Sequence, residues 1–584
     1  MYTKLLQVEK RTQKTLIYAG LEIMLRIFTN RNGRSGIRIA GATLLAACAL
    51  AANCMNPLAA QDEIAPGSRN TPERLEWFRD QGFGLFIHWG VDGQLGTVIS
   101  HSLVGASSDY TNRFFSDLPK TFNPTRFDPD EWARLARLAG VRYVMFTTKH
   151  HSGFTMYHSA TTPFGVANTP FKRDITAEVF NSFRGQGIAA GVYFSPDDFW
   201  WLHQHGIPIN RHVPEVEFAK NPDLLAYDKR QITELLKNYG PVDLVFFDGE
   251  AKDLRELAWN LNPNIVVTRG AMVTPELSVP SSALPGAWEA CITMGTAWQY
   301  QPDNEVYKSG HDLIRLLFQT RAKGGNLLLN IGPKPNGELA IEQENRLREM
   351  GLWMFVNSEA IYSVRPWIIP SEGISDRDRV WFTQGKNNGP LYAIVDSEDV
   401  WERGTWREFT LHSVKATAET KISVLGQDDK TLEYKPQVVP KSTFTQQQDG
   451  LHVRVMRAQR LQDNSKWPNA LVVKLTNVEP AVRPARIATG TAVLPADRSS
   501  ATLNGEILDL GDGDTAEAGF EYRAIAGEDI HARSTEWIAT PTHAVTVKGP
   551  FTFELRDLPP GTYEFHAIVK YPWLTFYGAD RVIR

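Results

Sequence analysis

The sequence predicts an α/β protein in which a (β/α)8-like barrel is followed by two β domains. Its 584 residues exceed the usual size of one domain. From about residue 70 to residue 365, apolar runs that suit strands alternate with amphipathic stretches that suit helices. After residue 365, short strand-like runs follow one another with turn residues between them. The first pattern is typical of a parallel sheet covered by helices, and the second of antiparallel sheets.

Residues 1–60 are predicted to be a signal region and not part of the fold. A basic flank is followed by an apolar run from about Ile39 and then by small residues, which is the order of a secretory signal. The apolar run is too short for a good membrane span. We expect Met24 to be the initiator and cleavage to occur near Ala60, so that the protein is secreted or periplasmic. The stretch "LLAAC" also resembles a lipoprotein box, and a lipid anchor on Cys48 is the alternative.

Charge and cysteine content narrow the possible partners and cofactors. The net charge of −4 argues against nucleic acid as the main partner, because phosphate binding needs a basic excess. The three cysteines are Cys48, Cys54 and Cys291, and only Cys291 follows the predicted cleavage point. The mature chain is therefore expected to have no internal disulfide and no cysteine cluster for zinc.

Seven strands can be identified in the barrel region, which we assign to residues 66–365. They lie at 83–90, 141–150, 187–196, 242–249, 264–270, 288–295 and 326–333. Most are continuous apolar runs without alternation, which is typical of strands covered on both faces. Amphipathic stretches such as 129–140 and 223–240 are the helices between them. An open doubly wound sheet is the alternative, because no eighth strand is evident.

Two β domains are expected after the barrel. Residues 366–482 contain short strand-like runs such as "RVWFTQG" and "ALVVKLTNV", which predict an antiparallel β-sandwich. The stretch "VEPAVRPAR" is a predicted linker. Residues 490–584 are expected to form an immunoglobulin-like or fibronectin-III-like domain. Neither β domain shows a motif that carries chemistry.

Polar side chains follow the predicted strands at the ends where a barrel has its active site. They include His88, His150, His151, Tyr193, Asp248 and Arg269. Asp248 comes directly after the apolar run "LVFF". Two carboxylates at a sugar site can act as nucleophile and acid/base, and the candidates for the second carboxylate are Glu250, Glu276 and Glu289. A helix cap or turn is the alternative role for Asp248.

Several motifs in a fixed order resemble the family 29 glycoside hydrolases, the α-L-fucosidases. They are "FIHWG", "TTKHHSGF", "KRDI", "GVYFSP", "VFFDG" and "NLLLNIGP", within residues 72–365. The resemblance implies a β/α barrel followed by a β-sandwich, a fucosylated glycan as substrate, no metal or other cofactor, and a retaining mechanism through a covalent glycosyl-enzyme. It matches Asp248 to the nucleophile and Arg269 to an arginine near the site. It also matches His88, His150, His151 and Tyr193 to residues that bind the fucose hydroxyls.

The resemblance leaves the acid/base open between Glu276 and Glu289. We favour Glu276, because in many relatives the residue lies in the loop soon after the arginine. Many relatives also carry a Glu-Trp pair after "HWG", which is absent here. His101, Asp109 or Tyr110 could replace it, and an α-L-galactoside is the alternative substrate. Trp298 could stack on the sugar or the aglycone, or belong to the core.

Two interpretations from other classes are also open. A metal-dependent barrel hydrolase could use His88, His150, His151 and Asp248, together with the histidines of "HQH". Adjacent histidines are poorly spaced ligands on a strand, since neighbouring side chains point to opposite faces. The other interpretation is a sugar-binding protein without catalysis, and the presence of both Asp248 and Glu276 argues against it.

Overall fold

The computed structural model describes residues 67–583 except 462, 463, 465, 496–499, 526–535 and 560. The chain divides into two compact units, residues 1–60 and 61–584, and all described residues belong to the second. The predicted signal region, with Met24, Cys48 and the cleavage point near Ala60, therefore lies outside the described residues. Within the described part of the chain, no helix combines the length and hydropathy that a membrane span requires.

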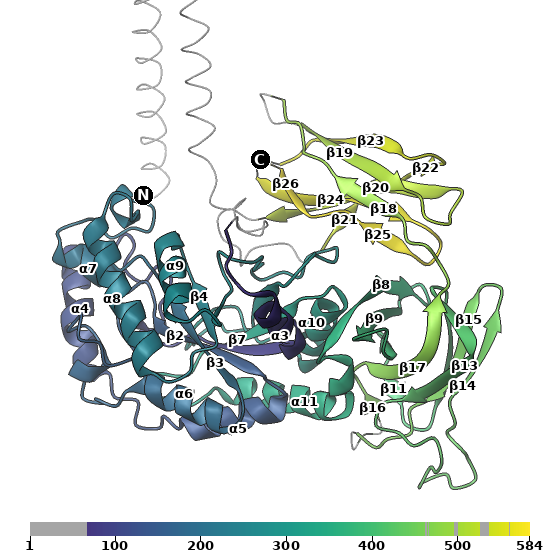
Figure 1. The fold of residues 1–584 in the computed structure, drawn as a ribbon, viewed down its shortest axis with the longest axis horizontal. Helices are drawn as coiled ribbons and strands as arrows, with labels where there is room; N and C mark the ends of the chain where they lie inside the picture. Colours follow the sequence, from purple (N-terminus) through teal and green to yellow (C-terminus); the bar gives the residue numbers. More distant parts are fainter. Residues whose placement is uncertain are drawn as a thin grey trace, which may run out of the picture. The chain divides into compact units, whose positions relative to one another are not determined.

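A parallel sheet of seven strands forms the centre of the first domain (Figure 1). The strands are β1 (Phe83–Ile87), β2 (Tyr143–Lys149), β3 (Ala189–Phe194), β4 (Leu244–Phe247), β5 (Val266–Val267), β6 (Glu289–Thr293) and β7 (Asn326–Ile331). Their order is β5-β4-β3-β2-β1-β7-β6. On each side of the β1–β7 pair, strands that are adjacent in the sheet are also consecutive in the chain. The same order is found in a barrel whose first strand pairs with its last. This order confirms the (β/α)8-like prediction over the doubly wound sheet, whose order reverses at a switch point.

Helices surround these strands. They are α3 (Pro72–Gln81), α4 (Ser108–Thr121), α5 (Pro129–Ala139), α6 (Ile175–Gly185), α7 (Phe199–Gln204), α8 (Pro222–Asn238), α9 (Lys252–Leu261), α10 (Gly310–Ala322) and α11 (Ile341–Asn357). In α5 the side chain of Asp128 caps the N-terminus, Pro129 opens the first turn and Gly140 ends the helix at φ 91°. These are the start and stop signals of the sequence.

Strand side chains alternate between two apolar clusters. One face contributes Phe86, Tyr143, Met145, Tyr193, Leu244, Phe246, Val266, Cys291 and Leu328 to the barrel interior. The other face, which includes Leu85, Val144, Val192 and Val245, joins the large core under the helices. Both faces are buried, which explains the continuous apolar runs.

Antiparallel sheets follow the barrel, in agreement with the predicted β domains. The first set comprises β8 (Val364–Gly373), β9 (Arg379–Gly385), β10 (Leu391–Asp396), β11 (Trp401–Glu402), β12 (Trp406–Leu411), β13 (Val414–Val424), β14 (Thr443–Gln447), β15 (Gly450–Met456), β16 (Lys466–Trp467) and β17 (Leu471–Pro480). The five-stranded sheet has the order β13-β17-β10-β9-β8, and β12-β15-β14 form another.

The last set of strands has an apolar core of its own, which includes Leu503, Phe520 and Phe565. It comprises β18 (Arg486–Thr489), β19 (Ser500–Asp509), β20 (Ala516–Ile525), β21 (Ile538–Ala539), β22 (His543–Val545), β23 (Gly549–Arg556), β24 (Thr562–Lys570), β25 (Thr575–Tyr577) and β26 (Arg581–Ile583). Strands β18, β19 and β23 form one sheet, and β20 and β24 are the central pair of the other. We call residues 486–583 the C-terminal domain.

Candidate active site

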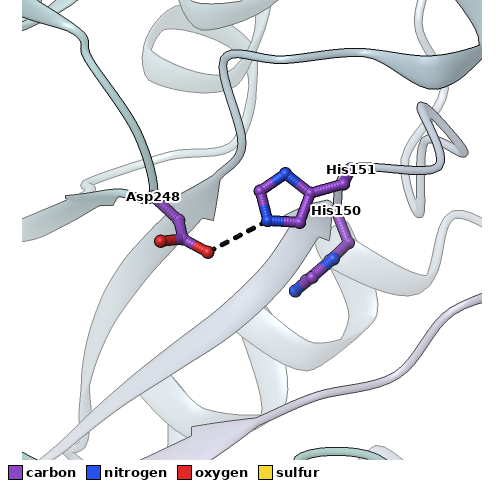
Figure 2. A group of neighbouring side chains, drawn as sticks. All are labelled: His150, His151 and Asp248. Atoms are coloured by element: carbon purple, nitrogen blue, oxygen red, sulfur yellow. Dashed lines mark hydrogen bonds and ion pairs between the residues drawn. The ribbon is translucent and has the colours of Figure 1, made fainter. Parts of the chain in front are cut away.

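Most of the predicted site residues meet at the carboxyl ends of the barrel strands, and Glu289 does not. Asp248 follows β4, and its N–H donates to the carbonyl of Phe194 at 3.0 Å, one step beyond the β3–β4 ladder. Figure 2 shows the His151 ring pointing at Asp248 with His150 beside it. The structure thus brings together side chains that are distant in the sequence.

Asp248 is the best-connected carboxylate of the site. Its Oδ2 accepts hydrogen bonds from Tyr193 Oη at 2.7 Å and from His151 Nε2 at 3.2 Å. Its Oδ1 accepts from Arg269 Nη1 at 3.1 Å. Burial by itself would raise the pKa of Asp248, but the hydrogen bond from His151 and the charges of Arg211 and Arg269 outweigh burial and hold this pKa well below its usual value. Asp248 is therefore ionised and still 18% exposed, as an attacking carboxylate must be.

The two adjacent histidines serve the same site from different directions. Their rings lie 4.6 Å apart with planes at 87°. Neighbouring side chains on a strand were expected to point to opposite faces. This expectation is wrong for His150 and His151, because β2 ends at Lys149 and both histidines follow the strand. His150 stacks on Tyr193 at 5.1 Å, while His151 contacts Asp248.

The two rings also differ in charge. Burial and the charge of His151 lower the pKa of His150 well below its usual value, so His150 is neutral. Burial and Arg211 would lower the pKa of His151, but the carboxylates of Asp197 and Asp248 raise it. Asp197 Oδ2 lies 2.9 Å from His151 Nδ1. His151 is therefore an imidazolium between two carboxylates.

His88 presents a defined tautomer. The amide nitrogen of Asn330 donates to the carbonyl of Trp298 at 2.6 Å, and its Oδ1 lies 2.6 Å from His88 Nδ1. Because an amide oxygen only accepts, Nδ1 carries the proton. Burial lowers the pKa of His88 to about 4. The ring is therefore neutral, and its Nε2 is a hydrogen-bond acceptor.

Lys149 lies behind the two histidines. It is fully buried, and its Nζ lies 3.2 Å from Asp198 and 2.9 Å from Asp228. Asp198 also caps α7, where it accepts from the Trp201 N–H at 2.8 Å. The adjacent residues Asp197 and Asp198 therefore pair with His151 and Lys149, and they tie the end of β2 to the start of α7.

Arg269 joins the two candidate carboxylates. It follows β5 and reaches Asp248 with Nη1 and Glu276 with Nη2. Its Nε donates to Thr274 Oγ1 at 3.3 Å. The Glu276 side chain is 21% exposed. One guanidinium thus holds Asp248 and Glu276 at the same rim of the barrel.

Glu289 lies elsewhere. It is the first residue of β6 and pairs in register with Asn326, the first residue of β7, so it belongs to the amino ends of the strands. It is fully buried in the barrel interior, where it accepts from Tyr143 Oη at 2.9 Å. Burial raises the pKa of Glu289 to about 7. Glu289 therefore lies at the amino end of β6, whereas the Glu276 side chain shares Arg269 with Asp248.

The aromatic candidate Trp298 is at the rim too. It is half-buried, and its ring lies 5.0 Å from the ring of His88. The residues proposed in place of the Glu-Trp pair are more peripheral: Asp109 is exposed and pairs with Arg113, Tyr110 packs near Phe114, and His101 is exposed.

Sequence reasoning missed Arg211 and Asn330. Arg211 comes from the loop after α7, where its Nε lies 3.3 Å from Asp197 Oδ2 and its Nη2 lies 4.0 Å from Asp248 Oδ2. No strand precedes it, so no local pattern marks it. Asn330 could have been predicted from its position, because it is a polar residue near the carboxyl end of β7, as the other site residues are near the ends of their strands.

The metal-site interpretation can be tested on this donor set. Ligand atoms of His150, His151 and Asp248 lie within 4.8 Å of one another. His151 is charged and occupied on both nitrogens, and the guanidiniums of Arg211 and Arg269 face the same carboxylate. A divalent cation would meet three positive charges here, so these residues suit a metal ion poorly.

Comparison with known proteins identifies the family. A family model described as Alpha-L-fucosidase matches residues 52–359. The chain belongs to this family. It is an α-L-fucosidase-like glycoside hydrolase. Human plasma alpha-L-fucosidase is 28% identical over 445 residues, which cover 69% of this chain and 90% of the human protein. Mouse tissue alpha-L-fucosidase is 30% identical over 394 residues, covering 60% and 83%.

Solved structures of the family share the fold of this fucosidase-family chain. Alpha-L-fucosidase isoenzyme 1 from Paenibacillus thiaminolyticus is 27% identical with a TM-score of 0.56, over 70% of this chain and 99% of that chain. The Thermotoga maritima alpha-fucosidase in complex with fucose has a TM-score of 0.55 at 23% identity, over 69% and 96%.

Proposed function

We propose that this enzyme releases terminal α-L-fucose from glycans by a retaining double displacement. The observation that carries the proposal is the Arg269 guanidinium bound to both Asp248 and Glu276. Family membership and the relatives named alpha-L-fucosidases support fucose as the sugar. They do not favour the alternatives of an α-L-galactoside substrate or of sugar binding without catalysis.

Asp248 is the proposed nucleophile. It is ionised, and its position after β4 leaves it partly exposed at the rim. In the first step it attacks the anomeric carbon while Glu276 protonates the departing oxygen, which gives a covalent glycosyl-enzyme. Retaining enzymes need the two carboxyl groups about 5 Å apart. Two carboxylates on one guanidinium are compatible with such a spacing.

Arg269 can serve both steps. Before the reaction it stabilises the charge of Asp248. Once Asp248 is esterified it carries no charge, and Arg269 keeps its contact with Glu276. Glu276, which gave up its proton in the first step, removes a proton from water, which attacks the anomeric carbon and releases the sugar.

The histidines and Tyr193 are the proposed sugar-binding residues. His88 offers an acceptor at Nε2 and His150 is neutral. Both nitrogens of His151 already face Asp197 and Asp248, so His151 holds Asp248 in place beside the sugar. Tyr193 already donates to Asp248, so its oxygen is left to accept. Neighbouring hydroxyls of a sugar ring are donors and acceptors at once, and this mixed set suits them. Trp298 is the proposed stacking surface at the edge of the site.

The test is hydrolysis of 4-nitrophenyl α-L-fucoside and the matching α-L-galactoside by wild type, Asp248→Ala, Glu276→Ala and Glu289→Gln. We expect the fucoside to be preferred, with losses of about 10³-fold or more for the first two variants and near-normal turnover for the third. Glu250→Ala is the control, because Glu250 is an exposed carboxylate two residues after Asp248 that accepts from the Lys252 N–H at 3.0 Å. NMR of the first-formed anomer tests retention, and a β-anomer as first product would refute the mechanism.

A further inference from the structure

The loop that carries Glu276 is strained directly after this residue. Residues 275–277 pair with β6: the Cys291 N–H donates to the Pro275 carbonyl at 2.9 Å, and the Leu277 N–H donates to the Cys291 carbonyl at 2.8 Å. Leu277 has φ 55°, a left-handed conformation that is unfavourable for a residue with a branched side chain. Such a conformation persists only where the surroundings impose it. The turn after Glu276 is therefore held by its pairing with β6 together with contacts further along the loop.

Two contacts from outside the loop meet it at consecutive residues. Lys323, at the end of α10, donates from Nζ to the carbonyl of Pro280 at 2.6 Å. The N–H of Ser281 donates to Oδ2 of Asp580 at 3.0 Å. Asp580 belongs to the C-terminal domain and stands just before β26. The domain for which the sequence indicated no chemistry thus contacts the loop of the proposed acid/base.

Asp580 is itself fixed by a buried chain of charged groups. His566, on β24, is 1% exposed and has Nδ1 3.0 Å from Asp580 Oδ1 and Nε2 3.2 Å from Glu521 Oε2. The rings of Trp537 and Tyr577 lie 4.2 Å and 5.3 Å from the His566 ring. Burial would lower the pKa of His566, but the two carboxylates raise it. Burial would raise the pKa of Asp580, but the hydrogen bond and charge of His566 lower it, so Asp580 is a charged acceptor for the Ser281 N–H.

We propose that Asp580 is a positioning residue for the reaction, and that the C-terminal domain thereby holds the loop that places Glu276. The proposal rests on the proposed acid/base role of Glu276. Proton transfer needs the donor within hydrogen-bond reach of the leaving oxygen. A misplacement of about 1 Å can cost about 10²-fold in rate. Loss of the Asp580–Ser281 contact releases the strained turn and moves Glu276 out of that reach.

The experiment compares kcat/KM of full-length Asp580→Ala on two fucosides that differ in their need for an acid. Methyl α-L-fucoside has a poor leaving group and needs protonation, whereas 2,4-dinitrophenyl α-L-fucoside does not. We expect kcat/KM to fall about 10-fold to 100-fold on the methyl glycoside and to stay within about 2-fold of wild type on the dinitrophenyl glycoside. A merely structural defect would lower both values together.

Ser281→Pro removes the same hydrogen bond from the loop side, because proline has no N–H. It should give the same selective loss, and it carries the test if Asp580→Ala does not fold. Glu564→Ala is the matched control: Glu564 forms a buried ion pair with Arg523 in the same domain, at 2.6 Å. Glu564→Ala should change kcat/KM by the same factor on the methyl and the dinitrophenyl fucoside.

The outcomes are distinct for the two proposals. Equal losses on both substrates, or no loss, for Asp580→Ala and Ser281→Pro would overturn the positioning role. Glu276→Gln is measured in parallel. If Glu276→Gln shows the selective loss and the other two variants do not, only the positioning role falls. If Glu276→Gln shows no selectivity, the acid/base assignment and the positioning role fall together.

Discussion

Nη2 of Arg211 lies 4.0 Å from Oδ2 of Asp248, while Arg269 contacts the other oxygen, Oδ1. Arg211 is oriented by Asp197, which lies 3.3 Å from its Nε. The proposed nucleophile thus faces two guanidiniums and the His151 imidazolium. This arrangement explains how a largely buried carboxylate stays ionised, because each positive charge offsets part of the cost of burial.

Arg211→Met should shift the acid limb of the pH profile of kcat/KM to higher pH. Arg211 lowers the pKa of Asp248, and the acid limb reports the ionisation of that group in the free enzyme. Removing the charge raises this pKa, so activity is lost earlier as the pH falls. Arg211→Lys keeps a positive charge and should shift the limb less. An unchanged acid limb in Arg211→Met would exclude this role.

Arg269→Lys should lower kcat by about 100-fold although the charge is kept. A lysine ammonium is a single point and cannot hold Asp248 and Glu276 with separate nitrogens, as the guanidinium does. Steady-state kinetics on 4-nitrophenyl α-L-fucoside checks this. Arg113→Lys is the control, since Arg113 is exposed and pairs with Asp109 on α4. Near-normal turnover of Arg269→Lys would show that bridging is not required.

Glu289→Gln should stabilise the protein at alkaline pH relative to wild type. The pKa of Glu289 is about 7 when folded, against an ordinary value of 4.5, so the folded state binds its proton more tightly. The wild type therefore loses stability as the pH rises from the ordinary value through the folded one, by on the order of 3 kcal/mol in total. Glutamine does not ionise and removes this loss.

Urea unfolding of wild type and Glu289→Gln at acidic and alkaline pH measures the difference. The control is Glu554→Gln, an exposed carboxylate paired with Arg556. If the difference in unfolding free energy between Glu289→Gln and wild type does not change with pH, the raised pKa is refuted.

Lys149→Met should destabilise the fold by about 3–5 kcal/mol, because it leaves the buried carboxylates of Asp198 and Asp228 without their cation. Lys120→Met removes an exposed partner of Asp117 and should leave the free energy of unfolding nearly unchanged, because solvent screens this surface pair. The two variants are compared by the midpoint and slope of urea unfolding. Equal costs would mean that the buried ion pairs contribute no more than a surface pair.

Local patterns were sufficient for the barrel and for part of the site. Continuous apolar runs mark strands that are buried on both faces, and a polar residue at the end of such a run marks the rim. His88, Asp248 and Arg269 were predictable in this way, since the first two directly follow β1 and β4 and Arg269 stands two residues after β5. The same rule could have found Asn330, near the end of β7.

Strand direction was needed to see that the two acid/base candidates lie in different surroundings, Glu289 beside Tyr143 and Glu276 on Arg269. Both Glu276 and Glu289 lie near the same strand in the sequence, between β5 and β6 or at the start of β6. Only the register of β6 with β7 shows that Glu289 belongs to the amino ends and the barrel interior. Two residues that are close in the sequence, as Glu276 and Glu289 are, can lie at either end of a strand.

The sequence by itself determined the order of strands and helices, the family motifs and the set of polar residues at the strand ends, because these depend on neighbours along the chain. The export signal stays a prediction from the sequence pattern. Only the tertiary structure decided the partners of these residues: Arg211 beside Asp248, Asp197 behind His151, and Asp580 at Ser281, which is 299 positions away. Such contacts depend on how loops and domains pack together, and no local periodicity encodes them.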